Sequence, residues 1–478
     1  MAVTAPDPRR WKALALICSA FFMTVLDVAI VNVALPTIKT SLHFSQPNLQ
    51  WVITAYSLTF GGFLLLGGRI GDLLGRRRIF MIGTGLFTLA SLTCGLSQNE
   101  GMLIVARGVQ GLGAALISPA VLAIISTTFE EGAERNKALG VSGAVAGSGA
   151  AFGVLLGGVL TKFLGWEWIF FVNVPVGAIV LMLTTRFVRE SHADVEHRRY
   201  DAAGAVTITA SLIILVYAIS RAPFVGWASA RTIGLLAVSV VLGAAFIWLE
   251  TNVKAPLLRL GIFRLRTLTG ANIVGFLLAG SLFAMFFLLT FYLQQVQHYS
   301  ALQTGVAFLA TAGTVVVVAG IAQALVTRVG VKPILATGLL LLTISQFRYT
   351  HLPVHGHYVS DLMPWFFIAG IGLAFSFIPV TIAALAGVAT HEAGLASGLI
   401  NTSQQVGGAI GVAVASTVYT SHLKTLFKAG DQQPLAQTGG FQWAFYVTTV
   451  IAAVGVIAAL LLIRQRDIPE GTEAVVPA

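Results

Sequence analysis

Two charged residues lie inside apolar runs long enough to span a membrane, where they could take part in proton transfer. Asp27 stands in the run 13–35, and Arg107 stands in the fourth such run. An arginine inside a membrane helix costs about 3 kcal/mol even on insertion scales, so it is expected to face a partner or water. Asp27 precedes Pro36 by nine residues, about 14 Å along a helix. Arg107 follows Glu100 by seven residues, about 10 Å, so the two charges are predicted to meet at similar depth.

This pairing suggests two roles. In the first, Asp27 binds and releases a driving proton, and a changing distance to Arg107 alters its affinity for protons. One proton crossing 100 mV gains about 2.3 kcal/mol, enough to drive a modest concentration ratio. In the second, Asp27 and Arg107 form a permanent ion pair that holds the first and fourth helices together. We favour proton coupling.

The loop 68–78 (GRIGDLLGRRR) joins the second and third apolar segments and combines glycines with an acidic and several basic residues. Asp72 and Arg76 have the spacing of an acid–base pair on one helical face, and the glycines allow a tight turn. Such a loop could hold the cytoplasmic ends of two halves together in an outward-facing state. The alternative is a positively charged cytoplasmic loop with a turn. The predicted latch residues are Gly68, Asp72, Gly75, Arg76 and Arg77.

Glycines at four-residue intervals mark the fifth apolar segment. Gly149, Gly153 and Gly157, followed by Gly158, form a stripe that lowers helix propensity but lets another helix pack closely. Shifting the chain by 258 residues places Gly149 and Gly153 on Gly407 and Gly411. Such parallel half-repeats are typical of secondary transporters, which bind substrate between their halves.

The substrate cavity is expected between the two repeats near the midplane, with Phe-rich walls, and polar residues of several segments are candidates for its lining. Each could instead make a hydrogen bond between helices, a common use of amides in membranes. Because segments nine to fourteen hold no second mid-helix acid, neutral or singly charged substrates are expected rather than dications. Three loop histidines (351, 355 and 357) are interpreted as solvated, and no metal site is predicted. The cavity candidates are Asn32, Gln110, Tyr292, Gln295, Asn401 and Gln405.

Composition excludes an ordinary soluble enzyme. The chain has 478 residues, of which 56% are hydrophobic and 10% charged, whereas soluble domains carry roughly 25% charged residues. The net charge of +10 is interpreted as basic cytoplasmic loops rather than nucleic-acid binding. Cys18 and Cys94 lie in apolar runs and imply no disulfide. The sequence therefore predicts an all-α polytopic membrane protein in contact with the lipid bilayer.

Polar residues, prolines and glycines separate fourteen apolar segments that are long enough to span a membrane. With the N-terminus in the cytoplasm, the cytoplasmic segments hold 21 Lys and Arg and the external loops hold seven, which supports this orientation. Both termini are then cytoplasmic. The segments are 12–35, 48–68, 78–97, 102–127, 137–161, 167–188, 203–221, 230–250, 268–293, 304–327, 332–349, 363–387, 396–420 and 441–464. The predicted organisation is a six-helix bundle (12–188), a cytoplasmic linker (189–202), two inserted helices (203–250), a second bundle (268–464) and a cytoplasmic tail (465–478).

Several stretches together resemble the major facilitator superfamily, specifically its fourteen-spanner drug:proton antiporters. The loop 68–78 is similar to the superfamily's signature loop, and 107–115 (RGVQGLGAA) to its helix-four motif. Stretch 140–158 resembles the antiporter motif of helix five, with Val154 where that motif usually has proline. Further similar stretches are 26–36 (LDVAIVNVALP), 166–175 (WEWIFFVNVP) and 292–295 (YLQQ), and Glu167 and His298 depart from the usual Arg and Gly.

The resemblance implies the major facilitator fold and a proton-driven exporter of small amphipathic compounds in a bacterial cytoplasmic membrane. It would work as a monomer, without a cofactor. The alternative within transport is a facilitator or proton-coupled importer of a metabolite, because fold does not settle function. A membrane enzyme is disfavoured because the sequence has no zinc-protease, phosphate-loop or nucleophile-elbow motif in a suitable setting. A sensor would need a soluble output domain.

Overall fold

The computed structural model describes residues 9–129, 133–191, 201–253, 256, 260–386, 388, 393–429 and 432–463. Among these residues, fourteen long helices correspond one to one with the predicted segments. The first seven are α1 (Arg10–Ser41), α3 (Trp51–Leu74), α4 (Arg76–Gly95), α5 (Glu100–Thr128), α6 (Ala133–Phe163), α8 (Asn173–Phe187) and α9 (Ala202–Val225). The other seven are α10 (Ala230–Asn252), α11 (Arg266–Phe291), α12 (Ala301–Val329), α13 (Val331–Tyr349), α14 (Met363–Leu385), α15 (Ala393–Lys428) and α16 (Gln433–Leu462).

Short helical turns flank several of the long helices. The turns α2 and α7 precede α3 and α8, a 3-10 turn precedes α11, and π-helical turns follow α11 and precede α14. Their bounds are Gln46–Leu49, Trp168–Phe171, Leu260–Arg264, Tyr292–Val296 and Tyr358–Leu362.

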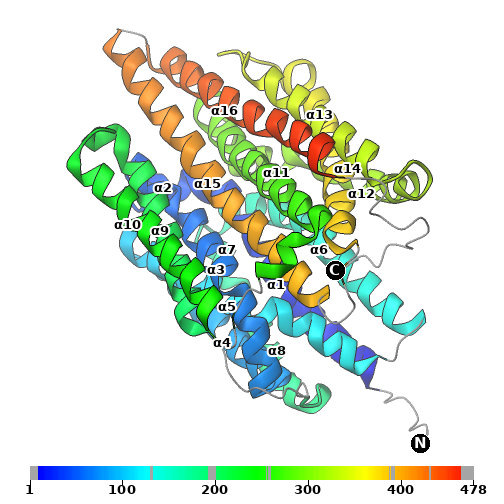
Figure 1. The fold of residues 1–478 in the computed structure, drawn as a ribbon. Coiled ribbons are helices and arrows are strands. Elements are labelled where there is room, and N and C mark those ends of the chain that lie inside the picture. Colours follow the sequence, from blue (N-terminus) through cyan, green and yellow to red (C-terminus); the bar gives the residue numbers. More distant parts are fainter. Residues whose placement is uncertain are drawn as a thin grey trace, which may run out of the picture.

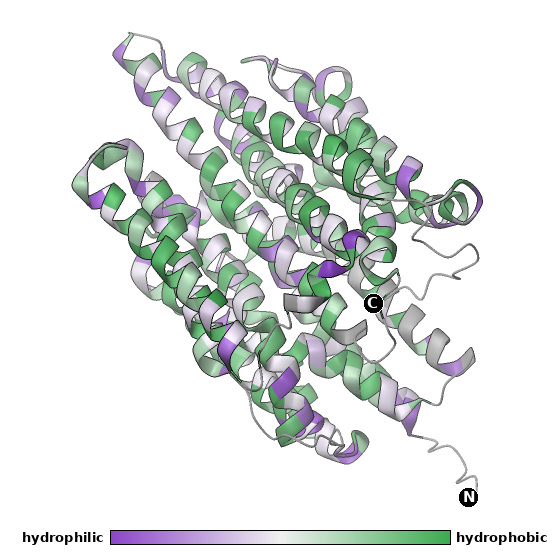
Figure 2. Cartoon of the chain, viewed as in Figure 1, coloured by the Kyte–Doolittle hydropathy of each residue, from purple (hydrophilic) through white to green (hydrophobic). Residues whose placement is uncertain are grey.

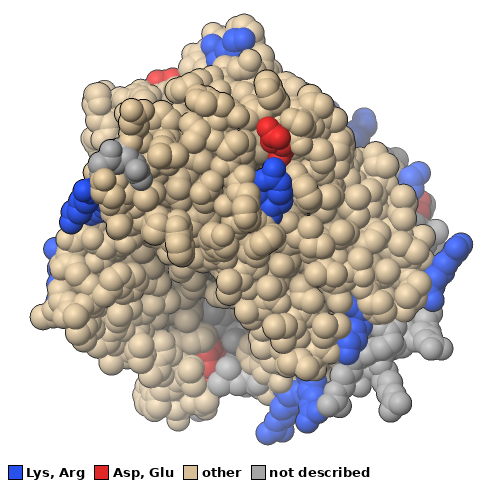
Figure 3. Space-filling model, turned by 90° about the horizontal axis from the view of Figure 1, so that it is seen from above, with Lys and Arg blue, Asp and Glu red and all other residues tan. Residues whose placement is uncertain are grey.

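The helices have the length and apolarity of membrane spans. Among the described residues, twelve helices are both long enough and apolar enough to cross a membrane. Figure 2 shows hydrophobic residues distributed along the helices. The helices α6 and α13 complete the fourteen: α6 is rich in glycine, and α13 carries Lys332 and Arg348 near its ends. Charged side chains are sparse on the face in Figure 3, where Lys and Arg are more frequent than Asp and Glu.

Two helices near the C-terminus are longer than the apolar pattern predicts. The segment 396–420 is part of α15, which continues to Lys428, and the segment 441–464 is part of α16, which begins at Gln433. The additional turns are polar and project beyond the apolar stretch, so hydropathy alone does not detect them. Pro434 lies in the first turn of α16, where its fixed φ suits a helix start.

The helices form two six-helix bundles and an inserted pair. The N-bundle contains α1, α3, α4, α5, α6 and α8, and the C-bundle contains α11 to α16. The inserted pair, α9 and α10, lies at the left edge of Figure 1, beside α3. In that view the long helix α15 runs between the inserted pair and the rest of the C-bundle. The predicted fold class is confirmed.

Two helix pairs join the bundles. On one side α3 meets α15, where the Thr402 hydroxyl donates to the Gly61 carbonyl at 3.1 Å. On the other side α6 meets α12, where a methyl group at Gly158 would come within 2.8 Å of the Ala301 carbonyl oxygen. At the end where α1 and α11 finish, the Gln294 amide also donates to the Val33 carbonyl at 2.8 Å. The interface between the halves is therefore built from close main-chain approaches.

The inserted pair contacts both bundles through α9. Its Thr209 packs directly on Gly62 of α3, and its Ile219 carbonyl accepts a hydrogen bond from Thr417 of α15 at 3.3 Å. Reciprocal hydrogen bonds of 2.8 and 2.9 Å between Ser211 and Ser239 tie α9 to α10. The pair thus covers the α3–α15 side of the interface.

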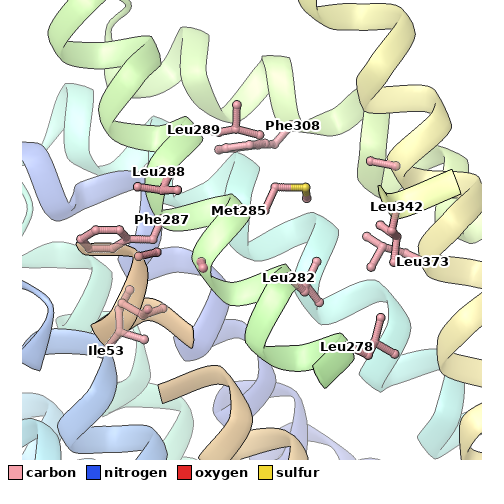
Figure 4. Close-up of a cluster of buried hydrophobic side chains, with 14 of the residues drawn as sticks. Ile53, Leu278, Leu282, Met285, Phe287, Leu288, Leu289, Phe308, Leu342 and Leu373 are labelled. Carbon is pink, nitrogen blue, oxygen red and sulfur yellow. The ribbon is translucent and has the colours of Figure 1, made fainter. Parts of the chain in front are cut away.

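The helix α11 is apolar all round because it is buried on several sides. Figure 4 shows Leu282 and Met285 on the side of α11 that faces Leu342 and Leu373, while Phe287 lies on the side of Ile53. All of these side chains are buried.

Equivalent glycines in the two bundles have equivalent packing. Gly149 and Gly153 of α6 lie against α1, and Gly407 and Gly411 of α15 lie against α11 at Phe276 and Gly280. These pairs are the ones that the 258-residue shift superimposes. The sequence repeat therefore corresponds to a repeated helix–helix contact.

Candidate functional site

Asp27 of α1 and Arg107 of α5 form a fully buried ion pair. The Arg107 Nη1 atom lies 2.5 Å from the Asp27 Oδ2 atom, and the two residues are only 1% and 0% exposed. Two charges removed from water in this way stabilise one another only if their remaining hydrogen-bonding groups also find partners. The sequence prediction that these two residues meet is matched by the geometry.

The Arg107 guanidinium contacts α1 through Asp27, and it also contacts α3 and α7. Its Nε donates to the Val52 carbonyl of α3 at 2.8 Å, and its Nη1 also donates to the Gln110 side chain at 2.6 Å. The guanidinium carbon lies 4.5 Å from the centroid of the Tyr56 ring and 5.7 Å from that of Phe170. Aromatic rings at these distances attract a cation and exclude water. Arg107 is therefore fixed by hydrogen bonds and lies next to two aromatic rings.

The second oxygen of Asp27 accepts from two amides. Gln110 donates to Asp27 Oδ1 at 2.8 Å, and Asn173 of α8 donates to the same atom at 3.3 Å. Both amides also donate to the Ser91 hydroxyl of α4, at 2.6 and 3.3 Å. These five side chains, which we name the coupling network, are Asp27, Ser91, Arg107, Gln110 and Asn173.

Sequence reasoning missed three members of this site: Ser91, Asn173 and Tyr56. Asn173 lies in the stretch 166–175 that resembles the family pattern, and it is a buried amide at the start of α8. Ser91 is a small hydroxyl on the buried face of α4, a type too common in membrane helices to stand out.

The loop 68–78 has a local ion pair and a turn. Arg76 Nε and Nη2 lie 3.0 and 2.8 Å from Asp72 Oδ1, so the predicted pair forms, but across the turn between α3 and α4 instead of on one helical face. Gly75 has φ = 110°, a conformation that other residues rarely adopt, and it separates α3 from α4. Gly68 lies against Pro119 of α5. In this conformation the side-chain hydrogen bonds between Asp72 and Arg76 stay within the N-bundle.

Two of the residues predicted to line the cavity lie in the protein interior instead. Gln110 is fully buried in the coupling network, because its amide can bridge Asp27, Arg107 and Ser91. Tyr292 is also fully buried, and its hydroxyl donates to the Pro353 carbonyl at 2.6 Å, so it anchors a loop instead of facing a substrate.

The other four candidates stay partly accessible. The Asn32 and Asn401 amides each donate to the carbonyl four residues earlier at 2.9 Å. Oxygen atoms of Asn32 and Gln405 are buried without a hydrogen-bond partner, and Gln405 faces Gly61 across the α3–α15 seam. Gln295 is half-buried in the π-helical turn after α11. Among the described residues, no hydrogen bond joins any of these four to another.

The glycine stripe of α6 brings it against α1 and α12. A methyl group at Gly149 would lie 2.9 Å from Val25, and one at Gly157 would lie 2.7 Å from the Ile30 carbonyl oxygen. Gly158 contacts α12 of the C-bundle. The helix runs without a break through Val154, where the family motif usually has proline. The stripe thus positions α1, which carries Asp27.

The variant Gly153→Ala is expected to lower thermal stability by about 1–3 kcal/mol, the usual cost of overpacking. The added methyl group would lie 2.7 Å from the Ala29 side chain and 2.9 Å from the Leu26 carbonyl oxygen. The matched control is Gly320→Ala on α12, where no heavy atom lies within 4 Å. Thermal unfolding in detergent checks this, and equal melting temperatures for the two variants would contradict the packing role.

No group of three or more His, Cys, Asp or Glu side chains among the described residues is placed to hold a metal ion. The chemistry that the site supports is the binding and release of a proton at a buried carboxylate next to a fixed cation. The coupling network contains the groups that this needs: an acid, a cation beside it, and two amides that hold the acid in place.

The chain is similar to bacterial resistance and export proteins. It is 39% identical to the puromycin resistance protein pur8 of Streptomyces alboniger, over 99% of this chain and 94% of that protein. It is 37% identical to the multidrug resistance protein Stp of Mycobacterium tuberculosis, covering 87% and 77%. It is 35% identical to the cephamycin export protein CmcT of Amycolatopsis lactamdurans, covering 97% and 95%.

Solved structures share the fold at low sequence identity. A peptide transporter POT in complex with sulfate matches with a TM-score of 0.69 and 15% identity, over 96% of each chain. A bacterial homologue of the lysosomal transporter Spinster matches with a TM-score of 0.66 and 15% identity, over 97% of this chain and 99% of that one. The family model of the Major Facilitator Superfamily matches residues 17–412. Together with the two-bundle fold, this match shows that the chain belongs to the Major Facilitator Superfamily.

Proposed function

We propose that this protein is a proton-coupled antiporter that exports small amphipathic compounds, such as antibiotics or toxic dyes, by alternating access. The observation that carries the proposal is the buried Asp27–Arg107 pair. A proton that binds to Asp27 takes the place of the ionic contact between Asp27 and Arg107. The names of the relatives support export, because they describe resistance to puromycin and export of cephamycin. A buried acid without a proton to carry would be an expensive feature in a membrane helix.

The coupling network suggests how the exchange operates. When Asp27 is charged, its two oxygens are held by Arg107 on one side and by Gln110 and Asn173 on the other. A proton on Asp27 removes the charge that Arg107 balances and weakens the contact between α1 and α5. Loss of the proton to the other side of the membrane restores it. Binding of substrate and of proton would thus favour different arrangements of the helices.

The topology belongs to the same proposal. We place both termini in the cytoplasm and the chain in the cytoplasmic membrane of a bacterium, supported by the basic cytoplasmic loops and by the bacterial sources of the relatives. The bundles 12–188 and 268–464 would move as units, and the linker 189–202 would join the first bundle to the inserted helices 203–250. The protein would act as a monomer without cofactor or enzymatic activity, driven by the proton gradient.

Reconstituted vesicles test the function directly. With an imposed pH gradient and a panel of neutral and singly charged lipophilic compounds, we expect substrate-induced proton release from the wild-type protein. A protonophore should stop accumulation of the substrate, and vesicles without protein serve as control. Substrate movement without proton flux would instead indicate a facilitator, and movement of proton and substrate in the same direction would indicate an importer.

A further inference from the structure

A carboxylate outside the predicted latch sits at the beginning of α4. Glu190, just after α8, accepts hydrogen bonds from the main-chain N–H groups of Arg77 at 3.0 Å and Arg78 at 3.2 Å. Its Oε2 also lies 3.7 Å from the Arg77 Nε. The first N–H groups of a helix have no partner within the helix, and the helix dipole favours a negative charge there.

The surrounding main chain is shaped to admit this carboxylate. A methyl group at Gly75 would lie 2.8 Å from the Glu190 carboxyl carbon. Glycine at this position therefore leaves room for the carboxylate and also permits the turn. The Arg76 N–H donates to the Ser191 carbonyl at 3.0 Å, and Arg77 Nη1 donates to the Val188 carbonyl at 3.3 Å. The segment 188–191 therefore crosses the start of α4 and makes several hydrogen bonds with it.

We propose that Glu190 is a positioning residue of the latch, an inference that rests on the proposed alternating-access function. By fixing the start of α4, it holds Asp72 and Arg76 in the orientation from which the latch closes on the cytoplasmic side. The same segment leads toward α9, the inserted helix that contacts both bundles. Glu190 thus connects the loop 68–78 to the segment between the bundles.

The charge of Glu190 matters more than its shape. In Glu190→Gln only one oxygen remains, so one of the two main-chain N–H groups loses its acceptor, and the ionic contact to Arg77 is lost. Because the latch closes in the outward-facing state, a loosened loop should favour the inward-facing state. We expect the inward-to-outward ratio to rise at least about threefold.

The ratio can be measured by distances between spin labels in the full-length protein. Thr185 at the end of α8 and Thr327 at the end of α12 are exposed and lie in different bundles, so cysteines there report on separation of the predicted cytoplasmic ends. The native Cys18 and Cys94 are buried and can stay. Glu134→Gln is the matched control, because Glu134 pairs with Arg10 at 2.6 Å at the same end without contacting the loop.

A double-mutant cycle separates positioning from simple stabilisation. If Glu190 acts through the latch, Glu190→Gln should have little further effect in an Asp72→Asn background, whereas an independent structural effect would add. Additive shifts, or a shift equal to that of Glu134→Gln, would overturn the proposal. The distances are measured without substrate or gradient, so they judge Glu190 even if the vesicle experiment shows no proton exchange.

Discussion

Proton-driven accumulation should disappear when Asp27 is replaced by asparagine, while the protein remains folded. Asparagine keeps the shape of the side chain and an oxygen for Arg107, but it cannot take up a proton. A pH difference of about 2 units supports a substrate ratio of about 100 in one-to-one exchange, because each factor of ten corresponds to about 1.4 kcal/mol. In Asp27→Asn vesicles we expect the ratio to fall to about 1.

Substrate counterflow without a pH gradient provides the internal check. Exchange of labelled for unlabelled substrate requires binding and alternating access but no net proton movement, so the Asp27→Asn variant should retain it. Glu167→Gln removes a carboxylate outside the coupling network and should leave accumulation unchanged. Full proton-coupled accumulation by Asp27→Asn would exclude Asp27 as the proton carrier and leave the permanent ion pair as its role.

The apolar pattern predicts the helices because a membrane span needs about 20 apolar residues. The meeting of Asp27 with Arg107 is predicted for a different reason. Charges inside a membrane are rare and need partners, so two opposite charges at similar computed depth have few alternatives. The ion pair of Asp72 and Arg76 is predicted from its spacing instead; it forms, although the two residues lie on either side of the turn between α3 and α4. Where the physics leaves few choices, a single sequence is enough.

Neutral side chains are less constrained, and there the sequence reasoning was weaker. Tyr292 and Gln110 were assigned to a cavity, yet both are fully buried, because a hydroxyl or amide in a helix can face a loop or a charged neighbour equally well. Ser91 and Asn173 join Asp27 only through the packing of α4 and α8. Glu190 meets α4 across 113 positions, and no periodicity in the sequence marks such a contact.

Replacement of Arg107 by glutamine is expected to destabilise the protein by about 3–5 kcal/mol, the usual result of leaving one charge of a buried pair without its partner. The variant would leave the Asp27 carboxylate buried with only Gln110 and Asn173 as donors. It would also remove the hydrogen bond from Arg107 Nε to the Val52 carbonyl. Thermal unfolding in detergent, together with the yield of monodisperse protein, measures the loss.

The double variant Asp27→Asn, Arg107→Gln distinguishes the two roles of the pair. With both charges removed, no carboxylate is left unbalanced, so stability should return to within about 1–2 kcal/mol of the wild type, since buried pairs add little net stability over neutral replacements. Proton-coupled accumulation should nevertheless stay absent, because the acid is gone. A stable double variant without coupling would assign the pair to transport. Recovery of coupling with neither charge present would contradict that assignment, and a double variant less stable than Arg107→Gln would show that the pair chiefly holds α1 and α5 together.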